Sequence, residues 1–402
     1  MDQSTSQPAP ADSTPWSVFL IFLRLGLTSF GGPIAHLGYF RDEFVLRRRW
    51  LSERAYADLV ALCQFLPGPA SSQVGFAIGL QRGGGWGAAA AWTAFTLPSA
   101  IILVAFALSA SLLDGPVSQG IIHGLKVAAV AVVAHAVLGM ARNLCPDQQR
   151  AGIALAAVLL VVFVGGTAGQ VSAILAGALA GLVLCQSADD GAAGHSGISV
   201  SNTTGRRTAF LYVFLLAGLP LLAWLAPSAL LDMLDGFYRA GALVFGGGHI
   251  MLPLLEAEVV QTGQVTADEF LAGYGAAQAV PGPLFTFAAY LGAVIGASAP
   301  ITWAALALLV IFLPGILILL AVLPHWNNFR RWHRAQSLMR GANAAVVGIL
   351  GAALYQPVFT SAIVGPGEFA LGLTGFLLLS AWRLPAWGVV IVMAAGGVLL
   401  GA

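Results

Sequence analysis

Two arginines in apolar surroundings are the residues of this sequence best suited to chemistry. Arg24 stands in RLGLTSFGGP and Arg239 in RAGALVFGGG, and Phe-Gly-Gly begins six residues after each of them. A guanidinium group binds a planar pair of oxygen atoms through two parallel hydrogen bonds, and a glycine pair lets the backbone approach a ligand closely. The repeated pattern predicts a binding site for a small oxyanion.

Two kinds of helix break accompany the arginines. The glycine pairs are Gly31-Gly32 and Gly246-Gly247, and the Pro-Gly-Pro elements are Pro67-Gly68-Pro69 and Pro281-Gly282-Pro283. A helix that starts after such a break presents unbonded N–H groups and the positive end of its dipole. Neutral donors near the breaks add to the predicted site: Thr28, Ser29, Gln64, Ser71, Ser72, Gln73, Gln278 and Thr286. For Pro-Gly-Pro taken alone, a simple packing kink is the favoured alternative.

Several ionisable residues near these breaks have an alternative, structural use. Glu43 and Glu258 could bind Arg24 and Arg239 as ion pairs that hold each hairpin together, or take part in ion coupling. Lys126, the only lysine of the chain, is a third candidate cation, with an ion pair to Asp58 or a position at a membrane interface as alternatives. His36, His249 and Asp58 could donate to an anion or carry a proton, and structural roles are favoured for all three.

The composition places these residues in a lipid bilayer. The chain is 58% hydrophobic and only 9% charged, with a mean hydropathy of +0.86. Runs that approach the roughly 20 apolar residues of a membrane span are Trp86–Ala110, Gly120–Met140, Thr208–Leu231, Ile301–Leu323 and Gly341–Tyr355. An arginine at the centre of such a span costs about 2.5–3.5 kcal/mol, so two in matching positions call for a function.

The chain also contains an internal repeat. Phe30-Gly31-Gly32 aligns with Phe245-Gly246-Gly247, and the Pro-Gly-Pro elements, FTLPSA with IFLPGI, and GLKVAAV with GANAAVV follow in the same order. The predicted divisions are a disordered cytoplasmic tail (1–15), a first repeat (16–185), a cytoplasmic linker (186–207), a linking transmembrane helix (208–231) and a second repeat (232–402).

Basic residues indicate how the two repeats face. Five arginines follow the first break (Arg41, Arg47, Arg48, Arg49 and Arg54), whereas the matching second-repeat segment has only acids. By the positive-inside rule, equivalent loops then lie on opposite sides of the membrane. We therefore predict an all-α integral membrane protein with two homologous halves in an inverted-topology repeat and broken or re-entrant helices. Such repeats typically bind substrate at mid-membrane depth and alternate its access.

Other functions leave no recognisable signal. The single lysine is not part of a phosphate-binding loop, and no catalytic motif stands at a plausible spacing. Cys63, Cys145 and Cys185 lack the spacing of a metal site or a disulfide framework. We expect no cofactor, no metal, no enzymatic activity and no nucleic-acid partner. The oligomeric state stays open, with a homodimer as one alternative.

With these motifs, the sequence resembles the long-chain, two-domain members of the chromate ion transporter family. The resemblance rests on SFGGPIAHLGYFRDEFVLRRRWLSERAYADLVALCQFLPGPASSQVGFAIG in the first half, and on FGGGHIMLPLLEAEVV and YGAAQAVPGPLFTFAAYLGA in the second. It implies efflux of chromate across the bacterial inner membrane by a secondary transporter, whose N-terminus the charge pattern predicts to be cytoplasmic. Sulfate is implied as a competing or exchanged anion. We therefore predict that Arg24 and Arg239 bind a tetrahedral dianion between the broken hairpins; another oxyanion as substrate, or a channel, is the alternative.

Overall fold

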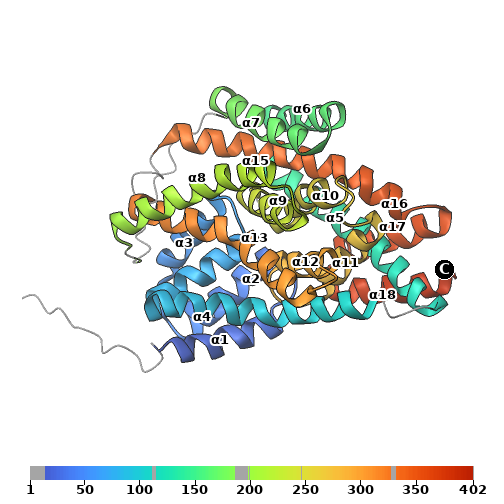
Figure 1. Cartoon of the computed structure of the whole chain (residues 1–402), viewed down its shortest axis with the longest axis horizontal. Helices are drawn as coiled ribbons and strands as arrows, with labels where there is room; N and C mark the ends of the chain where they lie inside the picture. Colours follow the sequence, from blue (N-terminus) through green and yellow to red (C-terminus); the bar gives the residue numbers. More distant parts are fainter. Residues whose placement is uncertain are drawn as a thin grey trace, which may run out of the picture.

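The computed structural model describes residues 14–110, 115–185, 198, 200–245, 247–326 and 332–401, and every regular element in these ranges is helical (Figure 1). Of the tail predicted for residues 1–15, only Thr14 and Pro15 belong to these ranges. They begin the first helix, because the Thr14 hydroxyl accepts a hydrogen bond from the backbone N–H of Ser17. Most of the predicted linker also lies outside the described residues.

The described residues of the first half form seven α-helices and one π-helical turn, η1 (Asp42–Arg47). The helices are α1 (Pro15–Thr28), α2 (Gly32–Arg41), α3 (Glu53–Phe65), α4 (Ala70–Ala110), α5 (Pro116–Leu144), α6 (Gln148–Val164) and α7 (Gly166–Leu184). Helix α4 is two helices joined at a kink, since Gly83 and Gly84 have non-helical backbone angles. Gly165 and Gly166, both with positive φ angles, form a hinge that separates α6 from α7.

The second half repeats this order after the linking helix α8 (Asn202–Leu225). Its elements are α9 (Ala229–Leu243), η2 (Gly248–Ile250), α10 (Met251–Val259), α11 (Ala267–Ala279), η3 (Leu284–Thr286), α12 (Phe287–Ile295), α13 (Pro300–Val322), η4 (Leu323–His325), α15 (His333–Ala353), η5 (Leu354–Phe359), α16 (Thr360–Ala362), α17 (Pro366–Ser380) and α18 (Ala386–Leu400). In this order α9 corresponds to α1, α13 to the second part of α4, and α15 to α5. The inverted orientation of the two halves remains a prediction.

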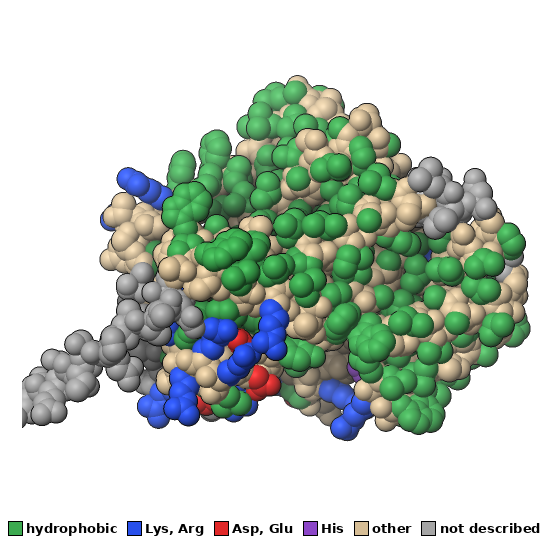
Figure 2. Space-filling view, turned by 90° about the horizontal axis from the view of Figure 1, so that it is seen from below, with side chains coloured by type: hydrophobic (Ala, Val, Ile, Leu, Met, Phe, Trp, Pro, Cys, Tyr) green, Lys and Arg blue, Asp and Glu red, His purple; other side chains and the backbone are tan. Residues whose placement is uncertain are grey.

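Six helices of the described chain are long and apolar enough to cross a membrane: 70–109, 116–144, 166–184, 202–225, 300–325 and 333–362. The linking span ends at Leu225 rather than at residue 231, because the Ser228 hydroxyl caps the start of α9. Its helix already begins at Asn202, inside the predicted linker. Charged side chains gather toward the α1–α3 end of the face in Figure 2, and most of the remaining face is hydrophobic, as a bilayer protein requires.

Glycines bring the two halves into close contact. On α5, a Cβ atom built at Gly124 would lie 2.2 Å from the carbonyl oxygen of Met393 on α18. On α15, a Cβ atom at Gly341 would lie 2.1 Å from the carbonyl oxygen of Gly177 on α7. Because α15 corresponds to α5 and α18 to α7, each half contributes the same pair of helices to the contact, and the core is shared between the halves.

Candidate functional site

The helix breaks of the two halves meet through a pair of reciprocal backbone hydrogen bonds. The N–H of Gly68 donates to the carbonyl of Val244 at 2.7 Å, and the N–H of Gly282 donates to the carbonyl of Ser29 at 2.9 Å. Ser29 and Val244 are equivalent residues, each placed directly before Phe-Gly-Gly. Each Pro-Gly-Pro element is thus bonded to the glycine break of the other half, and these two N–H groups are not free to bind an anion.

Backbone conformation explains why glycine occupies these positions. Gly68 and Gly282 have φ angles of +117° and +102°, and Gly31 has +101°. These angles lie in the left-handed region that favours glycine. A Cβ atom at Gly282 would also lie 2.8 Å from Ser99 Oγ, and one at Gly68 would lie 2.9 Å from Gly315 Cα. Each break therefore packs closely on a proline-containing helix of the opposite half.

Those helices are α4 and α13. Pro98 and Pro314 stand inside them, directly before Ser99 and Gly315. The Gln73 side chain joins the two halves here, because its Nε2 donates to the carbonyl oxygens of Pro67 at 2.9 Å and Gly315 at 2.8 Å. The predicted role of Gln73 as an anion donor is thus replaced by a structural one.

Buried polar atoms without a partner surround the first-half break. Ser29, His36 and Ser72 are 0%, 1% and 5% exposed, yet Ser29 Oγ, His36 Nε2 and Ser72 Oγ lack a hydrogen-bond partner among the described residues. The other ring nitrogen of His36 lies 3.4 Å from Ser71 Oγ. Leaving a buried donor unsatisfied costs about 1–3 kcal/mol, so this group has the chemistry to bind an oxyanion.

The sequence did not single out Thr96 and Ser99, although both belong to this region. Thr96 Oγ1 is buried without a partner, and the ring of the preceding Phe95 packs edge-on against His36 with centroids 5.3 Å apart. Ser99 contacts Gly282 and donates its hydroxyl hydrogen to the carbonyl of Thr96. Their position beside Pro98, in the repeated Leu-Pro element, was the signal that could have found them.

Arg24 lines an open pocket of about 220 Å³ with Thr28, Tyr39, Asp42, Glu43 and Arg47 among its neighbours. It makes no ion pair with any described residue. Glu43 instead accepts from Arg48 Nε at 2.6 Å and Arg47 Nη1 at 3.0 Å, so the Arg24–Glu43 alternative is wrong. Burial opposes ionisation of Glu43, but the bonds from Arg48 and Arg47 outweigh it and hold the pKa of Glu43 below its usual value.

Arg239 has the opposite environment. Its Nη2 lies 2.7 Å from Glu258 Oε2 and its Nη1 lies 2.9 Å from Asp235 Oδ2. Thr167, directly after the Gly165-Gly166 hinge, donates its hydroxyl hydrogen to Glu258 Oε1 at 2.8 Å. The ion pair considered for Glu258 is therefore present. Asp235 was missed, although its spacing of four residues from Arg239 is typical of helical ion pairs.

The two arginines occupy separate neighbourhoods. The pocket at Arg24 is lined by residues 21–47 only, whereas the partners of Arg239 lie on α9 and α10. No described contact joins them. Simultaneous binding of one dianion by both remains a prediction, and this arrangement is better suited to successive contacts.

The remaining candidates lie around this centre. Lys126 Nζ pairs with Asp268 Oδ1 at 2.9 Å, so its partner is not Asp58. His249 Nδ1 lies 3.0 Å from the Tyr274 hydroxyl. Gln278 Nε2 is buried without a partner, Gln64 is exposed at the end of α3, and Gly246 lies outside the described residues. The described residues contain no His, Cys, Asp and Glu cluster suited to a metal ion.

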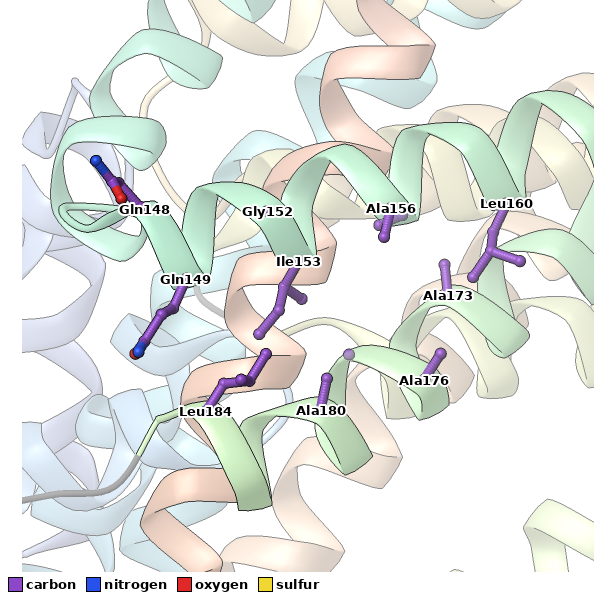
Figure 3. A pocket seen from close by; sticks show the side chains of 12 residues that line it. Gln148, Gln149, Gly152, Ile153, Ala156, Leu160, Ala173, Ala176, Ala180 and Leu184 are labelled. Atoms are coloured by element: carbon purple, nitrogen blue, oxygen red, sulfur yellow. The ribbon is translucent and has the colours of Figure 1, made fainter.

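A larger hollow, of about 470 Å³, lies between α6 and α7 (Figure 3). Its lining residues are Gln148, Gln149, Gly152, Ile153, Ala156, Ala157, Leu160, Ala173, Ala176, Gly177, Ala180 and Leu184. None of them is charged, so this groove offers a divalent anion no compensation for lost hydration. The polar breaks are the better candidate site.

Broken helices, apolar surfaces and a buried group of anion donors define a polytopic membrane protein of the transporter class. The family model for the chromate transporter matches residues 16–182 and again residues 231–401. The chain therefore belongs to the chromate transporter family, and this membership supports chromate transport.

Similar proteins cover nearly the full length. The chain is 27% identical to a chromate transport protein of Pseudomonas aeruginosa, over 98% of this chain and 94% of that protein. It is 27% identical to a probable chromate transport protein of Synechococcus elongatus, over 94% and 93%. A chromate transport protein of Cupriavidus metallidurans is 24% identical, over 95% and 91%. No solved structure matches the chain.

Proposed function

We propose that this protein exports chromate across the bacterial inner membrane as a secondary transporter and thereby gives chromate resistance. In this proposal the N-terminus is cytoplasmic, the two halves are inverted, and their rocking exposes the substrate to each side in turn. Sulfate, another tetrahedral dianion, competes or is exchanged.

The observation that carries the proposal is the meeting of the breaks. The bonds from Gly68 to Val244 and from Gly282 to Ser29 bring all four breaks to the contact between the halves. Unsatisfied donors of Ser29, His36 and Ser72 lie beside it. We place the dianion here, where neutral donors can replace its hydration shell without a fixed counter-charge.

In this proposal the two arginines bind the dianion in succession. Arg24 is exposed and free of ion pairs in a pocket that also holds Arg47, so it receives the anion from the cytoplasm. Arg239 contacts it on the opposite side, after release from its acidic partners. This division extends the predicted two-arginine site into an entry and an exit.

The membrane potential favours this direction. Moving one elementary charge across the membrane is worth about 2.3 kcal/mol per 100 mV. A dianion that leaves an inside-negative cell therefore gains about twice this amount, about 4.6 kcal/mol per 100 mV. Export needs no nucleotide hydrolysis in this scheme.

The test is uptake of radiolabelled chromate into inside-out vesicles, with sulfate as competitor. We expect wild type to accumulate chromate, and Arg24→Gln and Ser72→Ala each to reduce uptake at least tenfold while inserting normally. Arg54→Gln removes an exposed arginine of the same half that does not line the pocket, and it should leave uptake unchanged.

Three results would argue against the proposal. Normal uptake by both Arg24→Gln and Ser72→Ala would move the site elsewhere. Wild-type vesicles that take up sulfate but not chromate would assign another oxyanion, the alternative that the neutral donors also permit. Unitary currents would replace the carrier with a channel.

A further inference from the structure

The second half carries an excess of buried negative charge at Arg239. The side chains of Asp235 and Glu258 are 12% and 11% exposed, and both contact the guanidinium group. Two carboxylates and one guanidinium leave one negative charge uncompensated. A buried charge without compensation is costly, and neighbouring carboxylates relieve it by taking up a proton.

The surrounding helices provide no compensating cation in contact with this cluster. Within the described chain, α7 and α13 carry no ionisable side chain. The other ionisable groups on the elements packed against α9 and α10 are Asp232 and Tyr238 on α9, Glu256 on α10, His249 on η2, Tyr212, Arg206 and Arg207 on α8, and His333, Arg334 and Arg340 on α15. Glu256 is buried and accepts a hydrogen bond from Gln261, so it supplies no cation to the cluster.

The equivalent place in the first half has the reverse balance. Leu20 stands where the second half has Asp235, and Glu43 is paired with Arg47 and Arg48. Arg24 is consequently left free. One half presents an available guanidinium group, and the other presents one that is occupied at Nε, Nη1 and Nη2.

We propose that Asp235 and Glu258 form a proton-binding site that controls whether Arg239 can bind the transported dianion. With both carboxylates ionised, the guanidinium is occupied and the surrounding charge repels the anion. When a proton binds one carboxylate oxygen, that side chain becomes a neutral acid, and Arg239 can turn its paired N–H groups to two oxygens of the dianion. The inference rests on the proposed function, since its ligand is the dianion of that site.

This site gives the transport cycle a direction. The pocket at Arg24, whose guanidinium makes no ion pair with a described residue, collects the dianion, and the ionised Asp235–Arg239–Glu258 cluster releases it. When a proton binds the cluster, Arg239 can hold the anion and release is slowed. A low pH on the side of the membrane to which the cluster opens therefore retains the anion. Proton and dianion bind there cooperatively.

The experiment measures binding of radiolabelled chromate to the detergent-purified full-length protein over a pH series above neutrality, where chromate stays a dianion. If one proton must bind with the anion, the wild-type Kd rises about tenfold per pH unit at pH values above the proton affinity of the free site. Asp235→Asn and Glu258→Gln each remove one negative charge, so they should bind more tightly at the alkaline end and show a flattened pH dependence.

Two controls complete the design. Asp232→Asn removes an exposed acid of the same helix and should retain the wild-type slope. Arg239→Gln should bind weakly and lose the slope. Size-exclusion profiles identify variants that fail to fold. If one of Asp235→Asn and Glu258→Gln fails to fold, the other is sufficient for the test because each removes one negative charge.

The outcomes separate the two proposals. A wild-type Kd that does not change with pH, or Asp235→Asn and Glu258→Gln proteins that keep the wild-type slope, would overturn the proton site while chromate binding stands. Absence of chromate binding by the wild type at every pH would overturn the proposed function itself.

Discussion

Replacing each arginine of the duplicated pair by glutamine should lower stability to very different extents. Arg239→Gln leaves Asp235 and Glu258 as buried carboxylates without a cation, whereas Arg24→Gln removes a side chain that has no ion pair. Breaking a buried pair by removing one partner costs about 3–5 kcal/mol. An exposed substitution away from specific contacts usually stays within about 0.5 kcal/mol.

These energies translate into a measurable shift. Unfolding entropies of about 2.1 cal/mol/K per residue, applied to a chain of this length, give about 0.8 kcal/mol/K. Arg239→Gln should therefore lower the Tm by about 4–6 °C, and Arg24→Gln by less than about 1 °C. The reaction of a fluorogenic thiol reagent with the free cysteines Cys63, Cys145 and Cys185 reports unfolding during heating.

The control is a variant that lacks both the guanidinium group and the two carboxylates. Asp235→Asn and Glu258→Gln added to Arg239→Gln leave no uncompensated charge, and should recover most of the lost stability. Equal Tm values for Arg24→Gln and Arg239→Gln, or no recovery in the triple variant, would refute the different charge environments assigned to the two arginines.

Two further predictions use the contacts between the halves. Gly341→Leu would place a side chain against the backbone of Gly177 and should lower the free energy of unfolding by at least about 1–3 kcal/mol in the same thiol assay. The control Gly139→Leu adds a side chain in open space on α5 and should be neutral, so similar losses for both variants would contradict the close packing. Lys126→Ala removes the bond to Asp268, whose side chain is 66% exposed, so it should lower the free energy of unfolding by about 1 kcal/mol or less. A loss of stability as large as that of Arg239→Gln would show that this pair is buried in the membrane.

The sequence was sufficient for the positions of the breaks but not for their partners. Phe-Gly-Gly and Pro-Gly-Pro predict interruptions through local backbone rules, and α1, α2, α4 and α9 begin or end there. Which break contacts which depends on packing between residues far apart in the chain, and no local pattern encodes the bond from Gly282 to Ser29. The prediction of the breaks as free amide donors was therefore wrong for Gly68 and Gly282.

The ion pairs show the same limit. Equivalent positions of Glu43 and Glu258 suggested equivalent pairing, but Arg47 and Arg48 compete for Glu43 at one side, while Asp235 adds a second acid at the other. The two repeats share a backbone arrangement but not a charge balance, because a single substitution one helical turn away changes which residues form the ion pair.

The reciprocal bonds between breaks also affect how the protein is made. At about 5–20 residues per second, Val244 leaves the ribosome about 10–35 s after Gly68, its partner. During that interval the first half has inserted α-helices but no acceptor for the Gly68 amide, and its glycine faces on α5 and α7 have no helix to pack against. The newly synthesised first half is thus incomplete, because its breaks and its glycine faces lack their partners until the second half is inserted. Two separately synthesised halves should consequently assemble with each other, since neither can satisfy its own breaks.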